Sequence, residues 1–222
     1  RRQGAEDTTG RPFGRRRARR EGALASAAAP IHLTPATRNP ELAAEWFAQF
    51  EGAGLDGVVA KPLAGTYQPD KRTMFKIKHA RTADVVALGY RIHKSGEGVG
   101  SLLVGLYSED GTLYPVGGVA AWSNARRLEL IEELAPLVER DADGEALRGE
   151  GEKSRFQAGR ADSSFVRLRP ERVLEVRYDQ LEGMRFRHTV QFERWRPDRD
   201  ATSCTFEQLE TVGAYDLGDV LD

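Results

Sequence analysis

Three lysines and one aspartate gather in two short segments of the first eighty residues. Asp56 stands beside a glycine, an apolar run follows and ends at Lys61, and about fifteen residues later comes Lys76-Ile77-Lys78. Strand side chains alternate between faces, so Lys76 and Lys78 would share a face and Ile77 would lie on the other. Such ammonium groups repel one another unless an anion separates them, and a polyphosphate with a metal ion suits that place. Solvated lysines at strand ends are the alternative.

The elements around these residues follow from local patterns. Residues 55–61 and 74–79 have the pattern of short buried strands with charged ends. A helix precedes them, with Asn39 as N-cap and Pro40 at its first position, and glycines at 52 and 54 end it. Residues 30–35 lie between prolines and predict a short edge strand. Residues 15–24 are consistent with a basic helix and equally with disorder.

The chain changes character after Lys78. Residues 84–92 alternate, which predicts a strand with residues 86, 88, 90 and 92 on one face. A strand over 102–107, a hairpin turn at Asp110-Gly111 and a return strand over 113–119 follow. A helix then begins at Ser123, directs Leu128, Ile131 and Leu134 to a core, and ends or bends at Pro136.

The last third predicts a long charged loop over 140–163 and strands over 173–178 and 186–193. In the second of these strands Phe186, His188, Val190 and Phe192 would face inward. About five strands with one helix between the third and fourth suit a small closed barrel of the OB type. The chain is therefore expected to be α+β, with a domain boundary near residues 81–83.

Composition limits the class of protein. The 222 residues are 40% hydrophobic and 30% charged, with a net charge of −1. Arginines crowd the first twenty residues and residues 185–199, whereas acidic residues collect over 129–152; such segregation suits an anion-binding face. The one cysteine, Cys204, allows no intrachain disulfide and is expected to be a small apolar residue. No apolar run reaches the length of a membrane span, and a cytoplasmic protein without a membrane partner is expected.

Three blocks in order carry a resemblance. They are Leu55-Asp56-Gly57-Val58-Val59-Ala60-Lys61, Phe75-Lys76-Ile77-Lys78, and Arg187-His188 through Arg194-Trp195-Arg196-Pro197-Asp198-Arg199. They resemble motifs IV, V and VI of the covalent nucleotidyltransferases, most closely the bacterial ATP-dependent DNA ligases of the small actinobacterial ligase C type. The resemblance implies that residues 1–81 are the C-terminal part of an adenylation domain. Residues 82–222 would be an OB-fold domain that carries motif VI.

The resemblance also implies roles for the motif residues. Lys76 and Lys78 would contact ATP phosphates, Phe75 would belong to the nucleotide site, Lys61 would add a further cation, and Asp56 would bind the nucleotide or a metal ion, Mg²⁺ or Mn²⁺. Two positions depart from the family pattern. Motif IV more often begins with Glu where Asp56 stands, and motif VI usually ends in Asp-Lys where this chain has Asp198-Arg199.

Motif VI would orient the leaving pyrophosphate when the barrel closes over ATP, which excludes water from the site. The residues implied are Arg194, Arg196, Asp198 and Arg199. A surface arginine cluster balanced by Glu193 and Asp198 is the alternative. The family nucleophile stands in a Lys-x-Asp-Gly motif, and the printed sequence contains none. The chain also begins without methionine, so an N-terminally truncated ligase that cannot adenylylate itself is expected.

The expected partner is nicked double-stranded DNA, with a repair polymerase or end-binding proteins as further candidates, in DNA repair or recombination. Basic residues expected to contact DNA phosphates are Arg81, Arg91, Lys94, Arg126, Arg127, Arg185 and Arg187. Two other functions stay open. One is an OB module that binds nucleic acid without catalysis, and the other is an RNA ligase or capping-type nucleotidyltransferase.

Overall fold

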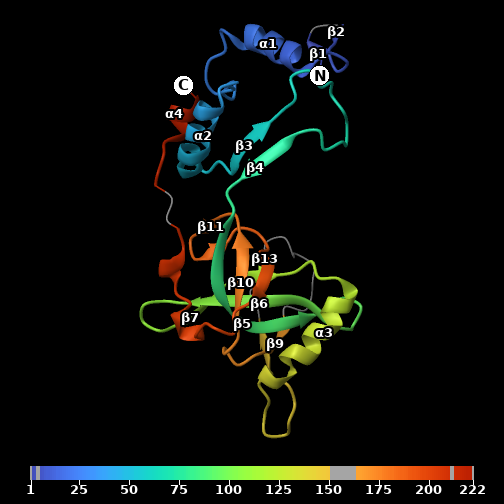
Figure 1. Cartoon of the computed structure of the whole chain (residues 1–222), viewed down its shortest axis with the longest axis vertical. Coiled ribbons are helices and arrows are strands. Elements are labelled where there is room, and N and C mark those ends of the chain that lie inside the picture. Colours follow the sequence, from blue (N-terminus) through green and yellow to red (C-terminus); the bar gives the residue numbers. More distant parts are fainter. Residues whose placement is uncertain (1, 4–5, 151–163, 211–212, 222) are drawn as a thin grey trace. The chain divides into compact units, whose positions relative to one another are not determined.

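The chain forms two compact units. The computed structural model describes residues 2–3, 6–150, 164–210 and 213–221. Unit 1 contains residues 1–79 and 211–222, and unit 2 contains residues 80–210 (Figure 1). The sequence predicts one boundary near residue 81 with all later residues in the barrel domain. In the structure the chain passes into unit 2 after His79 and returns to unit 1 after Glu210.

Unit 1 is built from short elements. They are β1 (Arg2–Gln3), β2 (Glu6–Asp7), α1 (Phe13–Leu24), α2 (Pro40–Gln49), the 3-10 helix η1 (Phe50–Ala53), β3 (Gly57–Ala60), β4 (Phe75–Lys78) and α4 (Leu217–Leu221). The arginine-rich segment is helical, so of the two interpretations of residues 15–24 the helix is confirmed. The predicted edge strand at 30–35 is wrong. These residues have no regular secondary structure. The Ile31 N–H donates to the Ala28 carbonyl and the Thr34 carbonyl accepts from Arg17 Nη2, so these backbone groups are not available to a partner strand.

Helix α2 begins as the sequence predicts. The Asn39 side-chain oxygen accepts hydrogen bonds from the backbone N–H groups of Glu41 at 2.8 Å and Leu42 at 3.2 Å. These bonds satisfy two of the N–H groups that a helix start leaves without partners. The helix passes into η1, which ends at Gly54 with a positive φ of 82°. The chain turns there toward β3.

Strands β3 and β4 pair antiparallel as a two-stranded sheet in which Val59 lies opposite Lys76 and Gly57 lies opposite Lys78. Both strands are shorter than predicted, and the expectation that they are buried is wrong. All four residues of β4 are exposed, and Phe75 has a relative exposure of 69%. A sheet of two strands has few neighbouring side chains with which to cover its apolar residues.

Unit 2 is a sheet that closes on itself. Its elements are β5 (Arg81–Ile92), β6 (Val99–Tyr107), β7 (Leu113–Val119), α3 (Asn124–Leu134), η2 (Ala135–Leu137), β8 (Arg148–Glu150), β9 (Ser164–Arg167), β10 (Val173–Tyr178), β11 (Leu181–Glu182), β12 (Arg185–Phe186), β13 (Gln191–Trp195), η4 (Ala201–Ser203) and η5 (Phe206–Gln208). The main sheet has the strand order β13-β10-β5-β6-β7 (Figure 1). A parallel bridge between Val119 and Val190 joins its two ends. This closure, with α3 after the third strand, confirms the predicted OB-type barrel within an α+β chain.

Several details of unit 2 differ from the sequence prediction. Residues 186–193 are not one strand: β12 ends at Phe186, β13 starts at Gln191, and His188 is exposed between them. The predicted loop over 140–163 contains β8, while residues 151–163 lie outside the described part. Strand β5 buries the consecutive residues 83–87, so its side chains are covered on both faces. It is a central strand of the sheet, with β10 and β6 paired along its two edges. The β5 pairing shifts register between Ala87 and Gly89, which interrupts the predicted alternation.

Apolar side chains of the barrel and α3 form the core. Among those that are fully buried are Leu102, Leu106, Leu130, Leu134 and Leu174. Each fully buried leucine contributes on the order of 1.5–3 kcal/mol. Cys204 is buried in this core, and burial raises the pKa of its thiol, which agrees with a packing residue. No helix among the described residues is long and apolar enough to cross a membrane.

The C-terminal segment packs on η1 of unit 1. The rings of Phe50 and Tyr215 lie 5.6 Å apart between centroids, and Val220 of α4 is buried. Gly52 allows this approach, because a Cβ atom there would lie 2.0 Å from the Gly213 carbonyl oxygen. Unit 1 is therefore assembled from both ends of the described chain.

Candidate active site

Strand β4 presents Lys76 and Lys78 on one face, as the alternation predicts. The opposite position on β3 is Gly57, which has a φ of 141° and contacts the β4 backbone closely. A Cβ atom at Gly57 would lie 2.1 Å from the Ile77 carbonyl oxygen. Only glycine therefore permits β3 to pair this closely with β4, and the pairing fixes where the two lysines point.

Asp56 and Lys78 are brought together. The Lys78 Nζ donates to Asp56 Oδ2 at 3.1 Å, and both side chains are partly exposed. An exposed pair of this kind adds little stability, so its value to the fold is small. It leaves a carboxylate and an ammonium group side by side at the end of the two-stranded sheet, where both can meet a phosphate and its counterion.

Lys61 and Phe75 are placed differently. The Lys61 Nζ lies 5.4 Å from the centroid of the Phe13 ring on α1, a cation–π arrangement. Phe75 precedes Lys76, so strand alternation places its ring on the opposite face from the two lysines. The roles of Lys61 and Phe75 in nucleotide binding stay predictions.

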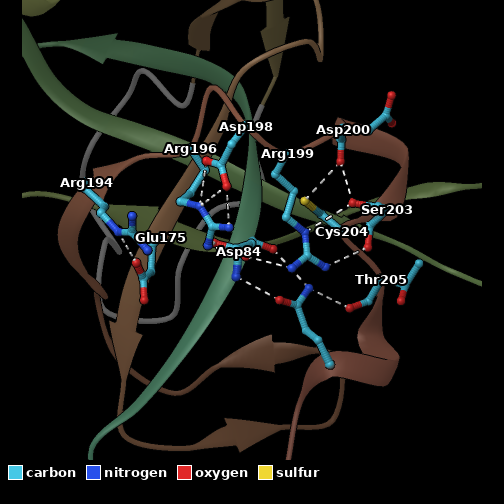
Figure 2. A network of polar contacts seen from close by, with 11 residues as sticks. Asp84, Glu175, Arg194, Arg196, Asp198, Arg199, Asp200, Ser203, Cys204 and Thr205 are labelled. Carbon is cyan, nitrogen blue, oxygen red and sulfur yellow. Dashed lines mark hydrogen bonds and ion pairs between the residues drawn. The ribbon is translucent and has the colours of Figure 1, made fainter.

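Unit 2 holds the arginines of the third block in a network of ion pairs (Figure 2). The Nη1 of Arg196 donates to both carboxylate oxygens of Asp84, at 3.1 and 3.0 Å. Its Nε donates to Asp198 Oδ1 at 2.9 Å, and its Nη2 donates to Asp198 Oδ2 at 2.8 Å. All three nitrogens of Arg196 thus donate within the chain.

Arg199 shares the same buried carboxylate. Its Nη1 donates to Asp84 Oδ2 at 2.9 Å, its Nε donates to the Ser203 hydroxyl at 3.1 Å, and its Nη2 donates to the Ser203 carbonyl at 3.2 Å. In Figure 2 the Asp84 carboxylate lies between the two guanidinium groups. One carboxylate on β5 therefore positions two arginines that lie more than a hundred residues later in the sequence.

The register of the sheet explains the third arginine. Asp84 on β5 lies opposite Glu175 on β10, and Glu175 lies opposite Arg194 on β13. Arg194 Nε donates to Glu175 Oε2 at 2.6 Å. Two carboxylates directly opposite on neighbouring strands repel each other, so the arginines offset that repulsion.

These contacts change the acidity of the groups. The hydrogen bonds from Arg196 lower the pKa of Asp198 to about 2, and the same bonds raise the pKa of Arg196. The bond from Arg194 lowers the pKa of Glu175, against the opposing effect of burial. Asp198 and Glu175 are therefore ionised at neutral pH. Asp84 forms ion pairs with both Arg196 and Arg199, and Asp198 forms an ion pair with Arg196.

Asp84 and Glu175 are the network residues that the sequence reasoning missed. The alternative of a cluster balanced by Glu193 and Asp198 is half right, since Asp198 pairs with Arg196 but Glu193 pairs with Arg177 at 2.6 Å. A signal for Asp84 existed: a carboxylate directly before the apolar run Val85-Val86-Ala87 is expected to be buried and to need a cation.

The residues expected to contact DNA have varied surroundings. Arg81 is largely buried and pairs with Glu210 at 2.6 Å, while Arg187 donates to Gln180 at 2.9 Å. Arg126 pairs with Glu129 and Glu133, and Arg127 donates to the Val99 carbonyl at 2.8 Å. Lys94 and Arg185 are exposed, and Arg91 is half-buried. A DNA contact by any of these residues stays a prediction.

Known proteins share both regions of the chain. Residues 4–78 match the ATP dependent DNA ligase domain, and residues 95–199 match the ATP dependent DNA ligase C terminal region. The chain is 58% identical to DNA ligase C2 of Mycolicibacterium smegmatis, covering 94% of this chain and 62% of that protein. It is 53% identical to DNA ligase C of Mycobacterium tuberculosis, covering 98% of this chain and 65% of that protein.

One solved structure, from a study of Lig E DNA ligases, matches at 15% identity with a TM-score of 0.51. It covers 85% of this chain and 60% of that chain, and it supports the fold alone. The chain spans less than two thirds of the length of both curated relatives. The family predicted from the three sequence blocks is confirmed. Two ligase regions matched in order, 4–78 and then 95–199, identify the chain as a member of the ATP-dependent DNA ligase family.

Proposed function

We propose that this chain is part of an ATP-dependent DNA ligase and binds the phosphates of ATP. Joined to a segment that carries the nucleophilic lysine, it would seal nicks in double-stranded DNA. The observation that carries the proposal is the shared face of Lys76 and Lys78, next to Asp56 at 3.1 Å from Lys78. A polyphosphate would offset the repulsion between the two lysine ammonium groups. Two matched ligase regions support the same assignment.

The proposed reaction has three displacements at phosphorus. A lysine attacks the α-phosphate of ATP and releases pyrophosphate; the 5′-phosphate at a nick then takes the AMP; the 3′-hydroxyl finally displaces the AMP and closes the strand. Each step gains most from alignment and charge stabilisation. Lys78 would hold the α-phosphate, Lys76 a neighbouring phosphate, and Arg194, Arg196 and Arg199 the departing pyrophosphate.

A divalent metal ion would lower the negative charge that the nucleophile meets. The described residues contain no group of three or more His, Cys, Asp or Glu side chains that could hold a metal ion by itself. Mg²⁺ commonly binds through one or two carboxylates, with phosphates and water filling the remaining positions. The single carboxylate of Asp56 fits that pattern, and it would bind a metal ion that arrives with the nucleotide.

The decisive experiment compares two polypeptides, each incubated with ATP radiolabelled at the α-phosphate, Mg²⁺ and a nicked DNA duplex. The polypeptide that joins these residues to a Lys-x-Asp-Gly segment should become covalently labelled and seal the nick. The chain of 222 residues alone should acquire no label, since it contains no such motif. Lys78→Ala in the longer polypeptide should lower labelling at least about tenfold, because a charged contact to phosphate is lost. A labelled 222-residue chain would contradict the proposal.

The same assay separates the two other functions. A nucleic-acid-binding OB module would bind duplex DNA with an affinity that falls as salt rises, yet would leave the nick open. Preference for a nicked RNA over a nicked DNA substrate would favour an RNA ligase, and transfer of a nucleotide to an RNA 5′ end would favour a capping-type enzyme.

A further inference from the structure

Arg196 is held between two carboxylates with different surroundings. Asp84 has a side-chain exposure of 8%, whereas Asp198 has an exposure of 61%. Asp84 occupies only the Nη1 of Arg196, while Asp198 occupies the Nε and Nη2 edge. The buried carboxylate therefore holds one corner of the guanidinium group, and the exposed carboxylate covers the edge that an anion would use.

Asp84 is itself fixed. The Asp84 N–H donates to the Gln208 side-chain oxygen at 2.8 Å, and the Gln208 amide nitrogen donates to the Asp84 carbonyl at 3.0 Å. These two hydrogen bonds to the Asp84 backbone add to the pairing of β5 with β10. The backbone of Asp84 is therefore fixed, and its carboxylate is held in turn by its bonds to Arg196 and Arg199.

A phosphate, like a carboxylate, offers two acceptor oxygens that can bind the guanidinium edge in a bidentate arrangement. Displacing Asp198 returns an exposed carboxylate to water, where it is solvated again. Displacing Asp84 would leave a charge buried without a cation, which costs much more. An incoming phosphate is therefore expected to replace Asp198 and to leave Asp84 in place.

We propose that Asp84 is a positioning residue that holds Arg196 and Arg199 ready for a polyphosphate, and that Asp198 occupies the phosphate position on Arg196 until the polyphosphate displaces it. The inference rests on the proposed function for the identity of the ligand class. It assigns opposite effects to two carboxylates on the same arginine. A purely electrostatic view assigns them the same effect, since each cancels one positive charge.

The test uses the 222-residue chain, inorganic tripolyphosphate as probe, and NMR of the arginine Nε–Hε groups. Asp84→Asn and Asp198→Asn are compared with Asp143→Asn, which removes one exposed carboxylate from a loop of unit 2. All three variants change the net charge equally. Relative to Asp143→Asn, Asp198→Asn should bind tripolyphosphate several-fold more tightly and Asp84→Asn about tenfold more weakly. In the anion-free protein Asp84→Asn should also broaden or shift the Nε–Hε signals of Arg196 and Arg199.

Several outcomes would overturn the inference. If Asp84→Asn binds tripolyphosphate as tightly as Asp143→Asn or more tightly, Asp84 is only a competing charge. If Asp198→Asn matches Asp143→Asn, Asp198 is not displaced. Should Asp84→Asn fail to fold, Gln208→Ala, which keeps the carboxylate but frees its backbone, must weaken binding in the same direction.

Failure of the proposed function has a different signature. It would appear as no shift of Arg196 and Arg199 signals when tripolyphosphate is added to the unsubstituted chain. The signals of the anion-free variants would then still decide whether Asp84 positions the two arginines.

Discussion

At the scale of single residues, the guanidinium group of Arg196 forms ion pairs with two carboxylates in different surroundings. Its bonds to Asp198 lie in a solvated turn, and those to Asp84 lie in the barrel wall. A carboxylate whose pKa is lowered by folding stabilises the folded state only while it is ionised. Asp198 therefore makes the stability of unit 2 sensitive to strong acid.

The prediction concerns the pH dependence of stability. Folding lowers the pKa of Asp198 from its ordinary 3.8 to about 2. The stabilisation by Asp198 should be complete above about pH 4 and should disappear as the pH falls toward about 2. The measurement is the difference in unfolding free energy between the unsubstituted chain and Asp198→Asn, from urea unfolding at several pH values. A difference that stays constant from pH 5 to pH 2 would contradict this account.

At the scale of elements, caps and turns were the most predictable features. Asn39, Ser123 and Asp110-Gly111 all occur where the sequence places them, because each forms bonds only with residues a few positions away. The Ser123 hydroxyl accepts from the Arg126 N–H at 3.2 Å, as an N-cap should. Local chemistry alone decides such positions.

Burial was less predictable than local structure. Of the three α3 residues expected in the core, Leu134 is fully buried and Ile131 packs against the core, but Leu128 is exposed. Leu130, which was not among the three, is fully buried. The side of α3 that meets the barrel decides which of these positions is covered. His188 was expected to face inward, but the chain turns at the hairpin of β11 and β12. His188 is exposed instead, and its Nδ1 lies 3.1 Å from Asp179 Oδ2. Contacts between distant segments decide which of these side chains are buried, and local sequence patterns do not indicate those contacts.

In the candidate site too, some residues could be predicted from local spacing and others could not. The spacing of Lys76 and Lys78 was enough to place both on one face. Nothing in the spacing around Arg196 indicates Asp84, which lies 112 residues earlier and meets Arg196 only through the register of the barrel. The basic residues of the site were therefore predictable from the sequence, and most of their acidic partners were not.

The cap of α2 provides a test at the element scale. Asn39→Ala removes the acceptor for two backbone N–H groups and should destabilise unit 1 by about 1 kcal/mol. Asn39→Asp keeps a side-chain oxygen at the same place and should retain most of the stability. The measurement is the thermal unfolding midpoint, together with amide hydrogen exchange of residues 41–43. Equal loss in both variants would show that the side-chain acceptor does not cap α2.

At the scale of the whole molecule, the chain order does not follow the two units. Residues 80–210 form unit 2, and the C-terminal residues rejoin unit 1. The contacts of Phe50 with Tyr215 and of Gly52 with Gly213 hold them there. Completion of unit 1 therefore requires residues that are synthesised after the entire barrel.

Gly52→Ala tests how much this return matters. The added methyl group would lie 2.0 Å from the Gly213 carbonyl oxygen and 2.8 Å from the Tyr215 backbone nitrogen, so the C-terminal segment must move away from η1. Amide exchange of residues 213–221 should rise at least about tenfold, with unit 2 unchanged. Gly22→Ala is the matched control, since nothing lies within 4 Å of a Cβ atom at Gly22, and alanine is favoured within helix α1. If residues 213–221 exchange equally in both variants, the packing of Tyr215 and Val220 on unit 1 does not depend on the space at Gly52.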